Sequence, residues 1–460
     1  MSHIAVIGAG YVGLVTASCF AEMGHSVACV EVNGARVAAL RRGQLPIEEP
    51  GLQELWTRHL ETGALSITEG YAEALEGRDF VFLCVGTPSL PDGRVNLEYV
   101  MMAARSIGAH AHGAPTVVIK STVPVGTAAM VAAMVNARRR PSQRLPVVSN
   151  PEFLREGEAV RDFLQPDRVI AAAEAVASLY RPLNCPLLFC DNATAEMIKY
   201  ASNAFLATKI SFVNELAGLC ERVGVDVQRV AQGMGMDHRI GPHFLGAGLG
   251  WGGSCLPKDT GALLAMGRGL QVPLPLLSAV VQVNAHQPRA VVHKLAWLLG
   301  SLEGRTVGVW GLTFKANTDD LRESPALVLL DLLRREGCQV RAYDPVVCRR
   351  AQQPVAGVAY ARDPYDAVRG AHAVVLATAW PEFLSLDMAR VRQEMAGDVV
   401  LDARNALDPV RLRRLGFTYV GIGRNGVAAP EPPPTDGVVQ PVAAPGAPVA
   451  AAPHFLPGAE

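Results

Sequence analysis

A glycine-rich turn near the N-terminus constrains the fold of this chain more than any other feature. Residues 3–8 form a short apolar run typical of a strand, and residues 11–23 carry the apolar spacing of a helix. Between them lies Gly8-x-Gly10-x-x-Gly13. Gly8 permits a tight turn, Gly10 lets the backbone approach a pyrophosphate, and Gly13 lets the helix pack closely on the strand. This context predicts a parallel βαβ unit that binds a dinucleotide at the helix N-terminus.

A carboxylate at the end of the second expected strand indicates which dinucleotide binds. Glu31 follows Gly13 by 18 residues, where a carboxylate accepts hydrogen bonds from the ribose hydroxyls and repels a 2′-phosphate. The sequence therefore predicts NAD as the cofactor. Thr122, in a loop after a later strand, is expected to offer a hydroxyl near the nicotinamide. The residues expected to contact the cofactor are Gly8, Gly10, Tyr11, Val12, Gly13, Glu31, Arg36, Gly86, Thr87, Thr122, Glu156 and Lys258.

Apolar runs alternate with helical patterns in two separate regions, which indicates two doubly wound parallel sheets. The strands expected in the first region are 3–8, 26–31, 80–85, 116–120 and 146–149. Those expected in the second region are 305–312, 339–344, 373–378, 399–403 and 418–423.

The middle of the chain reads as helical. Residues 192–224 form a pattern for one helix of about 30 residues, roughly 45 Å long at the usual rise per residue. A second helix is expected over 276–299, kinked or broken near Pro288. We predict an α/β fold with two Rossmann-like doubly wound domains joined by a long central helix and a small helical domain. The expected units are a cofactor domain at 1–190, a helical dimerisation domain at 191–300, a substrate domain at 301–425, and a disordered Pro/Ala-rich tail at 426–460.

Composition excludes several classes of partner. The 460 residues include 42 basic and 43 acidic side chains, so the net charge of −1 gives no general attraction to nucleic acid. No apolar run reaches the roughly 18–20 residues that span a bilayer, and the N-terminus lacks the basic region of a signal peptide. Nine scattered cysteines show no CxxC or other metal-ligand spacing. We expect a soluble cytoplasmic protein without a metal, a nucleic-acid partner or a membrane partner.

One cysteine stands out by its setting. Residues 252–259 read Gly-Gly-Ser-Cys-Leu-Pro-Lys-Asp, which places Cys255 in a glycine-rich turn before an expected helix start at Pro257. The positive end of the helix and the neighbouring Lys258 favour the thiolate, the nucleophilic form of cysteine. Together with a hydride-accepting cofactor, a reactive thiol suggests oxidation through an aldehyde to an acid, with the sulfur holding the aldehyde.

Several motifs in order along residues 1 to about 425 give the chain a family resemblance. They are GAGYVG (8–13), VGTP (85–88), STVPVGT (121–127), NPEFLREG (150–157), KYASNAFLATKISFVNE (199–215), RIGPHFLGAGLGWGGSCLPKD (239–259) and GLTFKANTDDLRESPA (311–326). On these motifs the chain resembles the UDP-glucose 6-dehydrogenase family, within the wider UDP-glucose/GDP-mannose dehydrogenase group. The resemblance implies a homodimer that oxidises UDP-glucose to UDP-glucuronate, with two NAD and one water consumed.

The resemblance also implies catalytic roles. Lys199 matches the family's active-site lysine, at the step in which a base takes the proton of the C6 hydroxyl. Asn203 lies one helical turn further along the same face and is implied to orient the C6 oxygen. Cys255 is the nucleophile that forms a thiohemiacetal and then a thioester. Asp259 is expected to handle water during hydrolysis, and Glu152 to act as an acid-base or water-positioning group. The full catalytic set is Cys255, Lys199, Asn203, Asp259, Glu152 and Thr122.

The implied substrate site draws on three segments. The 152–156 loop lines the sugar, Lys315 and Arg322 face the diphosphate, and the segment before Cys255 holds the uracil and ribose. Arg239 is implied to reach a neighbouring subunit, as is Arg404. The full substrate set is Glu152, Phe153, Leu154, Arg155, Glu156, Lys199, Asn203, Arg239, Phe244, Leu245, Gly248, Gly252, Lys315 and Arg322. Two departures from the family pattern are Trp251, where Phe or Tyr is frequent, and Asn33, where a second acid is frequent.

Three alternatives remain at the level of sequence. The same chemistry could act on GDP-mannose, UDP-N-acetylglucosamine or UDP-N-acetylmannosamine. A two-electron dehydrogenase of the β-hydroxyacid type would share the fold and the lysine but not the need for Cys255. A nucleotide-sensing regulator would keep the fold without catalysis.

Overall fold

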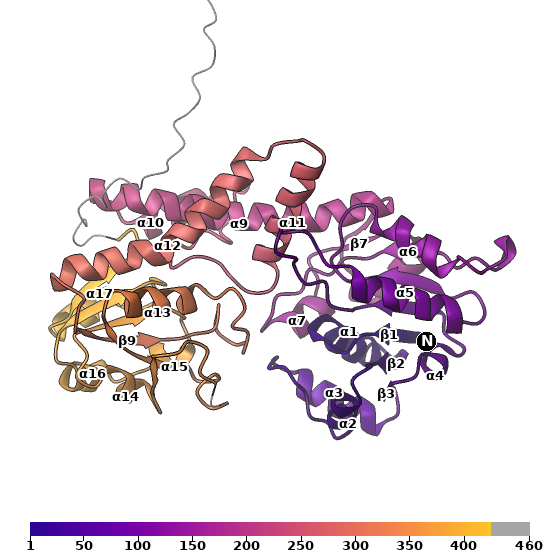
Figure 1. The fold of residues 1–460 in the computed structure, drawn as a ribbon, viewed down its shortest axis with the longest axis horizontal. Helices are drawn as coiled ribbons and strands as arrows, with labels where there is room; N and C mark the ends of the chain where they lie inside the picture. Colours follow the sequence, from indigo (N-terminus) through magenta and orange to yellow (C-terminus); the bar gives the residue numbers. More distant parts are fainter. Residues whose placement is uncertain (351, 425–460) are drawn as a thin grey trace, which may run out of the picture.

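The computed structural model describes residues 1–350 and 352–424. Two α/β regions lie side by side, and one long helix runs across both (Figure 1). The tail predicted at 426–460 lies outside the described residues.

The N-terminal sheet has six parallel strands in the order β3-β2-β1-β4-β5-β6. These are β1 (His3–Ile7), β2 (Ser26–Val30), β3 (Leu65–Thr68), β4 (Phe80–Leu83), β5 (Thr116–Ile119) and β6 (Val147–Ser149). Five of them match the expected strands. The sequence reasoning missed β3, a four-residue edge strand.

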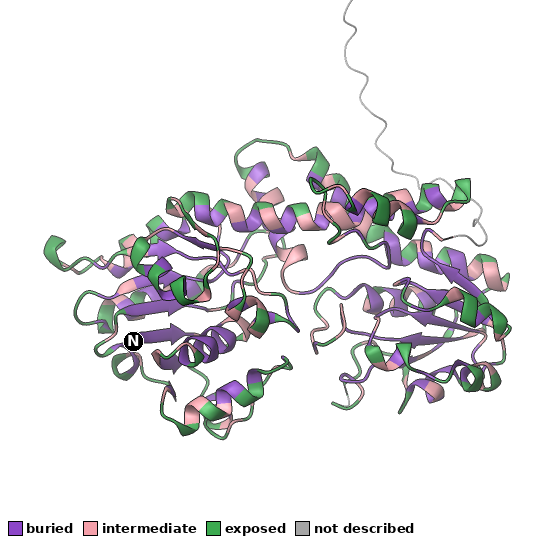
Figure 2. Ribbon diagram, turned by 180° about the vertical axis from the view of Figure 1, so that it is seen from behind, coloured by how far each residue is buried: buried purple, intermediate pink, exposed green. Residues whose placement is uncertain are grey.

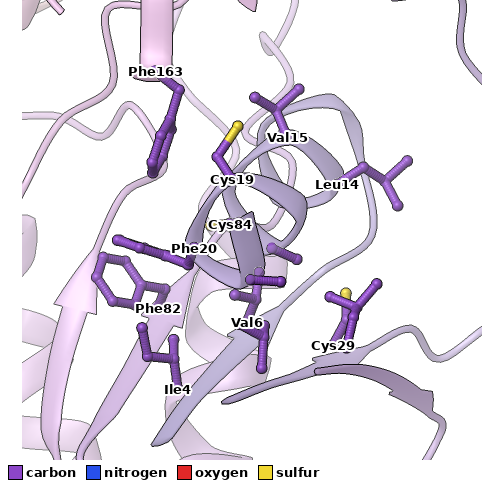
Figure 3. Packing of buried hydrophobic residues seen from close by; sticks show 14 of the residues in the cluster. Ile4, Val6, Leu14, Val15, Cys19, Phe20, Cys29, Phe82, Cys84 and Phe163 are labelled. Atoms are coloured by element: carbon purple, nitrogen blue, oxygen red, sulfur yellow. The ribbon is translucent and has the colours of Figure 1, made fainter. Parts of the chain in front are cut away.

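Alternate residues of each strand enter different cores, which is what a sheet covered on both faces requires. Ile4 and Val6 pack in one cluster with Phe20 and Phe82, while Ala5 and Ile7 belong to a second cluster. Figure 3 shows Phe20, Phe82 and Phe163 around the first cluster, and the ring centroids of Phe20 and Phe163 lie 5.1 Å apart.

Helices cover both faces of this sheet. The first cluster holds α1 (Tyr11–Glu22), α2 (Gly34–Arg41), α3 (Leu52–Glu61), α7 (Ala159–Leu164) and α8 (Glu174–Tyr180). The second holds α4 (Tyr71–Leu75), α5 (Glu98–His110) and α6 (Thr127–Val135). A small parallel pair, β7 (Val169–Ala171) and β8 (Leu187–Phe189), follows the sheet.

The central helix confirms the sequence prediction closely. Helix α9 spans Asn192–Val223, begins where Asp191 caps the backbone N–H of Thr194, and ends at Gly224 in the left-handed conformation. Three further helices follow: α10 (Val227–Gly235), α11 (Leu256–Gly269) and α12 (Pro275–Leu299). Of the kink or break predicted near Pro288, the break is wrong, because α12 continues through that residue. Pro288 is buried and α12 packs along α9, so tertiary packing offsets the local cost of about 3 kcal/mol.

The C-terminal sheet repeats the first in its strand order, β11-β10-β9-β12-β13-β14, again all parallel. Its strands are β9 (Thr306–Trp310), β10 (Gln339–Tyr343), β11 (Ala359–Tyr360), β12 (Ala373–Leu376), β13 (Val399–Asp402) and β14 (Thr418–Gly421). Its helices are α13 (Pro325–Arg335), α14 (Pro364–Val368), α15 (Pro381–Leu384), α16 (Met388–Glu394) and α17 (Pro409–Arg414). The two-residue β11 was not predicted.

The predicted fold class is thus confirmed: two doubly wound sheets joined by a long helix. Buried residues concentrate in the two sheets and on the inner faces of their helices (Figure 2). Among the described residues, every helix is too short or too polar to cross a membrane.

Candidate active site

The glycine turn after β1 forms a cradle that fits a pyrophosphate. Gly8 has φ +100°, and a Cβ at Gly13 would lie 1.8 Å from the carbonyl oxygen of Gly8, so only glycine fits there. A Cβ at Gly10 would meet no described atom within 4 Å. Gly10 is also the N-cap of α1, and its position supplies no side-chain cap. The first N–H groups of α1 thus have no side-chain cap, and an anion can serve as their acceptor.

Glu31 stands at the end of β2 as predicted. Its carboxylate accepts a hydrogen bond from the backbone N–H of Asn33 at 2.9 Å and contacts Nη1 of Arg36 at 3.4 Å. Arg36 thus meets the carboxylate predicted to bind the ribose. The cradle and this carboxylate together fit a dinucleotide with an unmodified ribose.

Other predicted cofactor residues line the same edge of the sheet. Gly86 and Thr87 follow β4, and Thr122 follows β5, with both threonines buried. Tyr11 instead links the cofactor turn to another loop, since its hydroxyl donates to Glu49 and accepts from the backbone N–H of Gly157 at 2.9 Å.

Two polar pairs from distant segments meet on one face of α9. Nζ of Lys199 lies 3.0 Å from Oε1 of Glu152. One turn later, Nδ2 of Asn203 donates to Oδ2 of Asp259 at 2.5 Å. All four side chains are buried. The fold therefore brings these predicted catalytic residues together.

Lys199 and Glu152 stabilise each other's charged forms because their side chains lie so close together. Burial lowers the pKa of Lys199, but Glu152, Cys255 and Asp259 outweigh it and leave the pKa raised. Burial raises the pKa of Glu152, but Lys199 and the backbone N–H of Leu154 outweigh it and leave the pKa lowered. Lys199 is thus an ammonium ion in the free protein and cannot take a proton until it has given one up.

The expectation that Cys255 is a thiolate is wrong for the free protein. Cys255 is the N-cap of α11, as the sequence suggested. Burial, followed by the charge of Glu152, raises the pKa of its thiol to about 11, although Lys199 acts in the opposite direction. Lys258 does not offset this, because its Nζ lies 2.5 Å from Oδ1 of Asp259. Desolvation outweighs the helix terminus here.

Some side chains of the 152–156 loop lie in the site and others lie at the surface. Phe153 lies beneath two cations, with Cζ of Arg168 3.8 Å and Nζ of Lys199 5.3 Å from its ring centroid. Leu154 is half-buried and donates its backbone N–H to Glu152. Nη2 of Arg155 contacts Glu158 and Asp162, each at 2.6 Å, and its side chain is half-exposed.

Glu156 meets the C-terminal region. Its Oε1 accepts from Oγ of Ser254 at 2.8 Å and lies 3.4 Å from Nη2 of Arg322. The same Nη2 lies 2.7 Å from Oδ2 of Asp320. Burial lowers the pKa of Lys315, although the nearby Glu158 and Glu156 act to raise it. Both cations predicted to face the diphosphate thus lie beside the 152–156 loop.

The segment before Cys255 packs against the C-terminal sheet, which corrects two expectations. Leu245 is buried in the C-terminal core and is not free to face a ligand. Arg404 does not reach outward: its guanidinium donates to the carbonyls of Ala377, Gly250 and Phe314 within the same chain. Burial lowers its pKa to about 10.

The remaining residues of that segment have diverse settings. A Cβ at Gly248 would lie 2.7 Å from the carbonyl of Ala403, and one at Gly252 would lie 2.1 Å from that of Glu323. Both glycines permit close backbone packing. Phe244 is half-buried with φ +63°. Arg239 is exposed and pairs with Asp237 at 2.6 Å, apart from the buried site residues.

Sequence reasoning missed the carboxylates that hold the loops in place. Glu49 accepts the backbone N–H groups of Gly157 and Ala159, and Glu196 accepts those of Gly126 and Ala128. Each carboxylate caps the start of a helix, α7 or α6, and so fixes a loop of the site. For Glu196 a signal existed, since it lies three residues before Lys199 on α9. Ser254 and Asp320 lie within the motifs quoted above, but no role was predicted for them, and Arg168 lies outside those motifs.

Comparison with known proteins agrees with this geometry. Residues 2–184, 193–286 and 308–409 match, in turn, the NAD-binding, central and UDP-binding domains of the UDP-glucose/GDP-mannose dehydrogenase family. A protein named UDP-glucose 6-dehydrogenase from Pseudomonas aeruginosa is 49% identical over 442 residues, covering 92% of this chain and 97% of that protein. The chain belongs to the UDP-glucose/GDP-mannose dehydrogenase family. The predictions of family and of NAD as cofactor are thereby confirmed.

Further relatives cover the described chain equally well. A UDP-glucose 6-dehydrogenase from Rhizobium meliloti is 45% identical, covering 92% of this chain and 99% of that protein. The solved structure of a UDP-glucose dehydrogenase from Pyrobaculum islandicum has a TM-score of 0.84 at 42% identity, covering 92% of this chain and 98% of the other. That of a UDP-D-ManNAc dehydrogenase from Pyrococcus horikoshii has a TM-score of 0.79 at 29% identity, covering 92% and 100%.

Proposed function

We propose that this protein oxidises C6 of UDP-glucose in two NAD-dependent steps, giving UDP-glucuronate. The observation that carries the proposal is the convergence of Cys255 with the Lys199–Glu152 and Asn203–Asp259 pairs between a dinucleotide cradle and the C-terminal sheet. The relatives named UDP-glucose 6-dehydrogenase at 42–49% identity support this substrate. When bound, NAD supplies the hydride acceptor for each oxidation.

In the first oxidation the Lys199–Glu152 pair receives the hydroxyl proton. Lys199 passes one of its protons to Glu152 across 3.0 Å and takes the proton of the C6 hydroxyl in its place. Asn203, held by Asp259, orients the C6 oxygen. The carbon becomes an aldehyde as its hydride leaves.

In the second oxidation Cys255 makes the aldehyde oxidisable. Its sulfur bonds to the aldehyde carbon and the Lys199–Glu152 pair returns a proton to the oxygen, giving a thiohemiacetal. That carbon then loses a hydride while its hydroxyl proton passes back to the Lys199–Glu152 pair, which leaves a thioester. Water, which Asp259 positions, breaks the sulfur–carbon bond and releases the acid and the thiol.

A diphosphate fits beside Lys315 and Arg322. The side chain of Arg322 is 64% exposed and offers a charged donor beyond its contacts with Asp320, and Lys315 contributes a point charge. We assign the uracil and ribose to the loop of residues 244–252, apart from the side chain of Leu245, which packs in the C-terminal core.

Product mass and NADH count test the proposal together. We expect two NADH and a uronate from each UDP-glucose, and much lower rates with GDP-mannose, UDP-N-acetylglucosamine and UDP-N-acetylmannosamine. UDP-N-acetylmannosamine is the second candidate, because the Pyrococcus horikoshii structure shares this fold at 29% identity. Cys255→Ser is expected to stop before the acid. One NADH per sugar in the unaltered protein would favour a two-electron dehydrogenase, and binding without turnover would favour a regulator.

We also propose a homodimer formed through α9. Phe205, Phe212 and Leu219 recur at seven-residue spacing on α9 and are 65%, 46% and 58% exposed. Such a stripe of large apolar side chains is typical of a helix that packs on a partner. Arg239 would then enter the partner's site. The scattered free thiols favour a reducing compartment, so we place the dimer in the cytoplasm.

Sedimentation tests the dimer. Phe212→Glu is expected to give monomers, and Val410→Glu, at an equally exposed apolar position on α17, is expected to leave the mass unchanged. A dimer that persists with Glu at both 205 and 212 would refute this interface.

A further inference from the structure

The sulfur of Cys255 is a protonated thiol, yet the proposed reaction needs it as a nucleophile. The proton must therefore leave during attack. Oγ of Ser254 lies 3.5 Å from Sγ of Cys255, within hydrogen-bond reach for sulfur. Ser254 is the neighbouring residue in the turn that begins α11.

Ser254 has its own hydrogen committed elsewhere. Its Oγ donates to Oε1 of Glu156 at 2.8 Å. A carboxylate can only accept, so the lone pairs of Oγ are left to face the sulfur. The thiol, the hydroxyl and the carboxylate thus form a continuous path in which every donor meets an acceptor.

Glu156 is suited to end that path. It is 8% exposed, and its second oxygen, Oε2, is buried without a hydrogen-bond partner among the described residues. Burial, followed by the charge of Asp320, raises the pKa of Glu156 to about 7. Arg322 acts in the opposite direction. The carboxyl group is therefore poised to take up a proton near neutral pH.

The other carboxylates near Cys255 are less available. Glu152 is paired with Lys199, and Asp259 is held by Asn203 and Lys258. The charged groups that face the sulfur are Glu152, Lys199, Asp259 and Arg322, and those that face Glu156 are Asp320, Arg322 and Lys315. Within this set, Glu156 is the carboxyl group that a hydrogen-bonded path through Ser254 connects to the sulfur.

We propose that Ser254 relays the thiol proton of Cys255 to Glu156 as the sulfur attacks the aldehyde. The step rests on the proposed function and balances: the S–H proton passes to Oγ, the hydroxyl proton passes to the carboxylate, and the sulfur electron pair forms the S–C bond. The carbonyl π pair moves to oxygen, which the Lys199–Glu152 pair protonates. When the thioester is hydrolysed, the same path returns the proton to the departing sulfur.

Alkylation of Cys255 tests the relay without cofactor or sugar. Full-length protein is treated with iodoacetamide between pH 5.5 and 9.5, and modification of Cys255 is followed by peptide mass spectrometry. In the unaltered protein the rate is expected to rise through an inflection near pH 7, where Glu156 ionises, and then to flatten. In Ser254→Ala the inflection disappears and the rate at pH 8 falls about 100-fold, the scale of general base catalysis. Ser254→Thr, which keeps a hydroxyl, restores the inflection.

Two further variants keep the test decisive. Glu156→Gln is expected to lose the inflection as well, and it replaces Ser254→Ala should that variant fail to fold by circular dichroism. Ser278→Ala removes a hydroxyl on α12 whose hydrogen bond among the described residues goes to the carbonyl of Leu274, and it should leave the profile unchanged. The relay is overturned if Ser254→Ala, or Glu156→Gln in its place, keeps the profile of the unaltered protein.

Counting NADH separates this outcome from failure of the proposed function. If the unaltered protein gives two NADH per sugar and Ser254→Ala alkylates normally, the relay alone is wrong. If the unaltered protein gives one NADH, the proposed function is wrong, whatever the alkylation profile shows.

Discussion

The two sheets share a strand order but differ in the segment that connects their first strand to the next helix. After β1, residues 8–10 form a turn and α1 begins at Tyr11. After β9, residues 311–324 form a long loop before α13. The short turn exposes the positive end of a helix to a ligand. The long loop instead brings Asp320 and Arg322 to the 152–156 loop of the other half.

The acidic residue that follows the second strand of each sheet, Glu31 or Asp344, also differs in its surroundings between the two sheets. Glu31 ends β2, and each oxygen of its carboxylate has a single described contact, with the backbone N–H of Asn33 and with Nη1 of Arg36. Asp344 ends β10, is fully buried, and accepts hydrogen bonds from Leu312, Val346, Val347 and Trp380. The C-terminal sheet thus uses this position to hold its own loops, whereas in the N-terminal sheet we expect it to serve the cofactor.

Asp344→Asn should show the largest effect. An amide cannot accept all of these hydrogen bonds, and each buried N–H left without a partner costs about 1–3 kcal/mol, so we expect a loss of roughly 4 kcal/mol in the free energy of unfolding. Denaturant titration measures it. Glu31→Gln, the matched change in the other sheet, should stay within about 0.5 kcal/mol of the unaltered protein. Equal losses in the two variants would contradict the comparison.

Glu31→Gln should instead weaken cofactor binding. A hydrogen bond to a charged group contributes about 1.5–3 kcal/mol, so the Kd for NAD should rise roughly thirtyfold. Calorimetric titration with NAD measures this. Asp344→Asn, studied below its unfolding transition, should bind NAD normally. An unchanged Kd in Glu31→Gln would remove Glu31 from the cofactor site.

Gly10→Ala should also weaken NAD binding, but by less than Glu31→Gln does. The added methyl points into open space, so stability should not change, but it occupies the place assigned to the pyrophosphate. We expect about tenfold weaker NAD binding, or about 1.4 kcal/mol. Gly233→Ala, also in open space but on α10, should bind as the unaltered protein does. Normal binding by Gly10→Ala would mean that the dinucleotide does not approach this glycine.

The sequence was most informative where local patterns decide the structure. The buried strands and α9 could be predicted because their periods and end residues, such as Asp191 and Gly224, act locally. The strands β3 and β11 were missed, since their four and two residues contain no continuous apolar run.

The site was predictable in its members but not in their charges. Cys255, Lys199, Asn203 and Asp259 were identified, yet the protonation of Cys255 was predicted with the wrong sign. The pKa of Cys255 depends on burial by segments that lie far away in the sequence, and a local motif does not predict that burial. Arg404 was misplaced for a similar reason, because its partners are carbonyls of distant loops.

Peptide mass analysis of the protein quenched during turnover tests the central claim most directly. With UDP-glucose and NAD present, we predict that the peptide containing Cys255 carries a sulfur-linked sugar acyl group, and that Cys255→Ser carries none. Formation of the acid at the normal rate while Cys255 stays unmodified, or while its thiol is blocked by alkylation, would contradict the account.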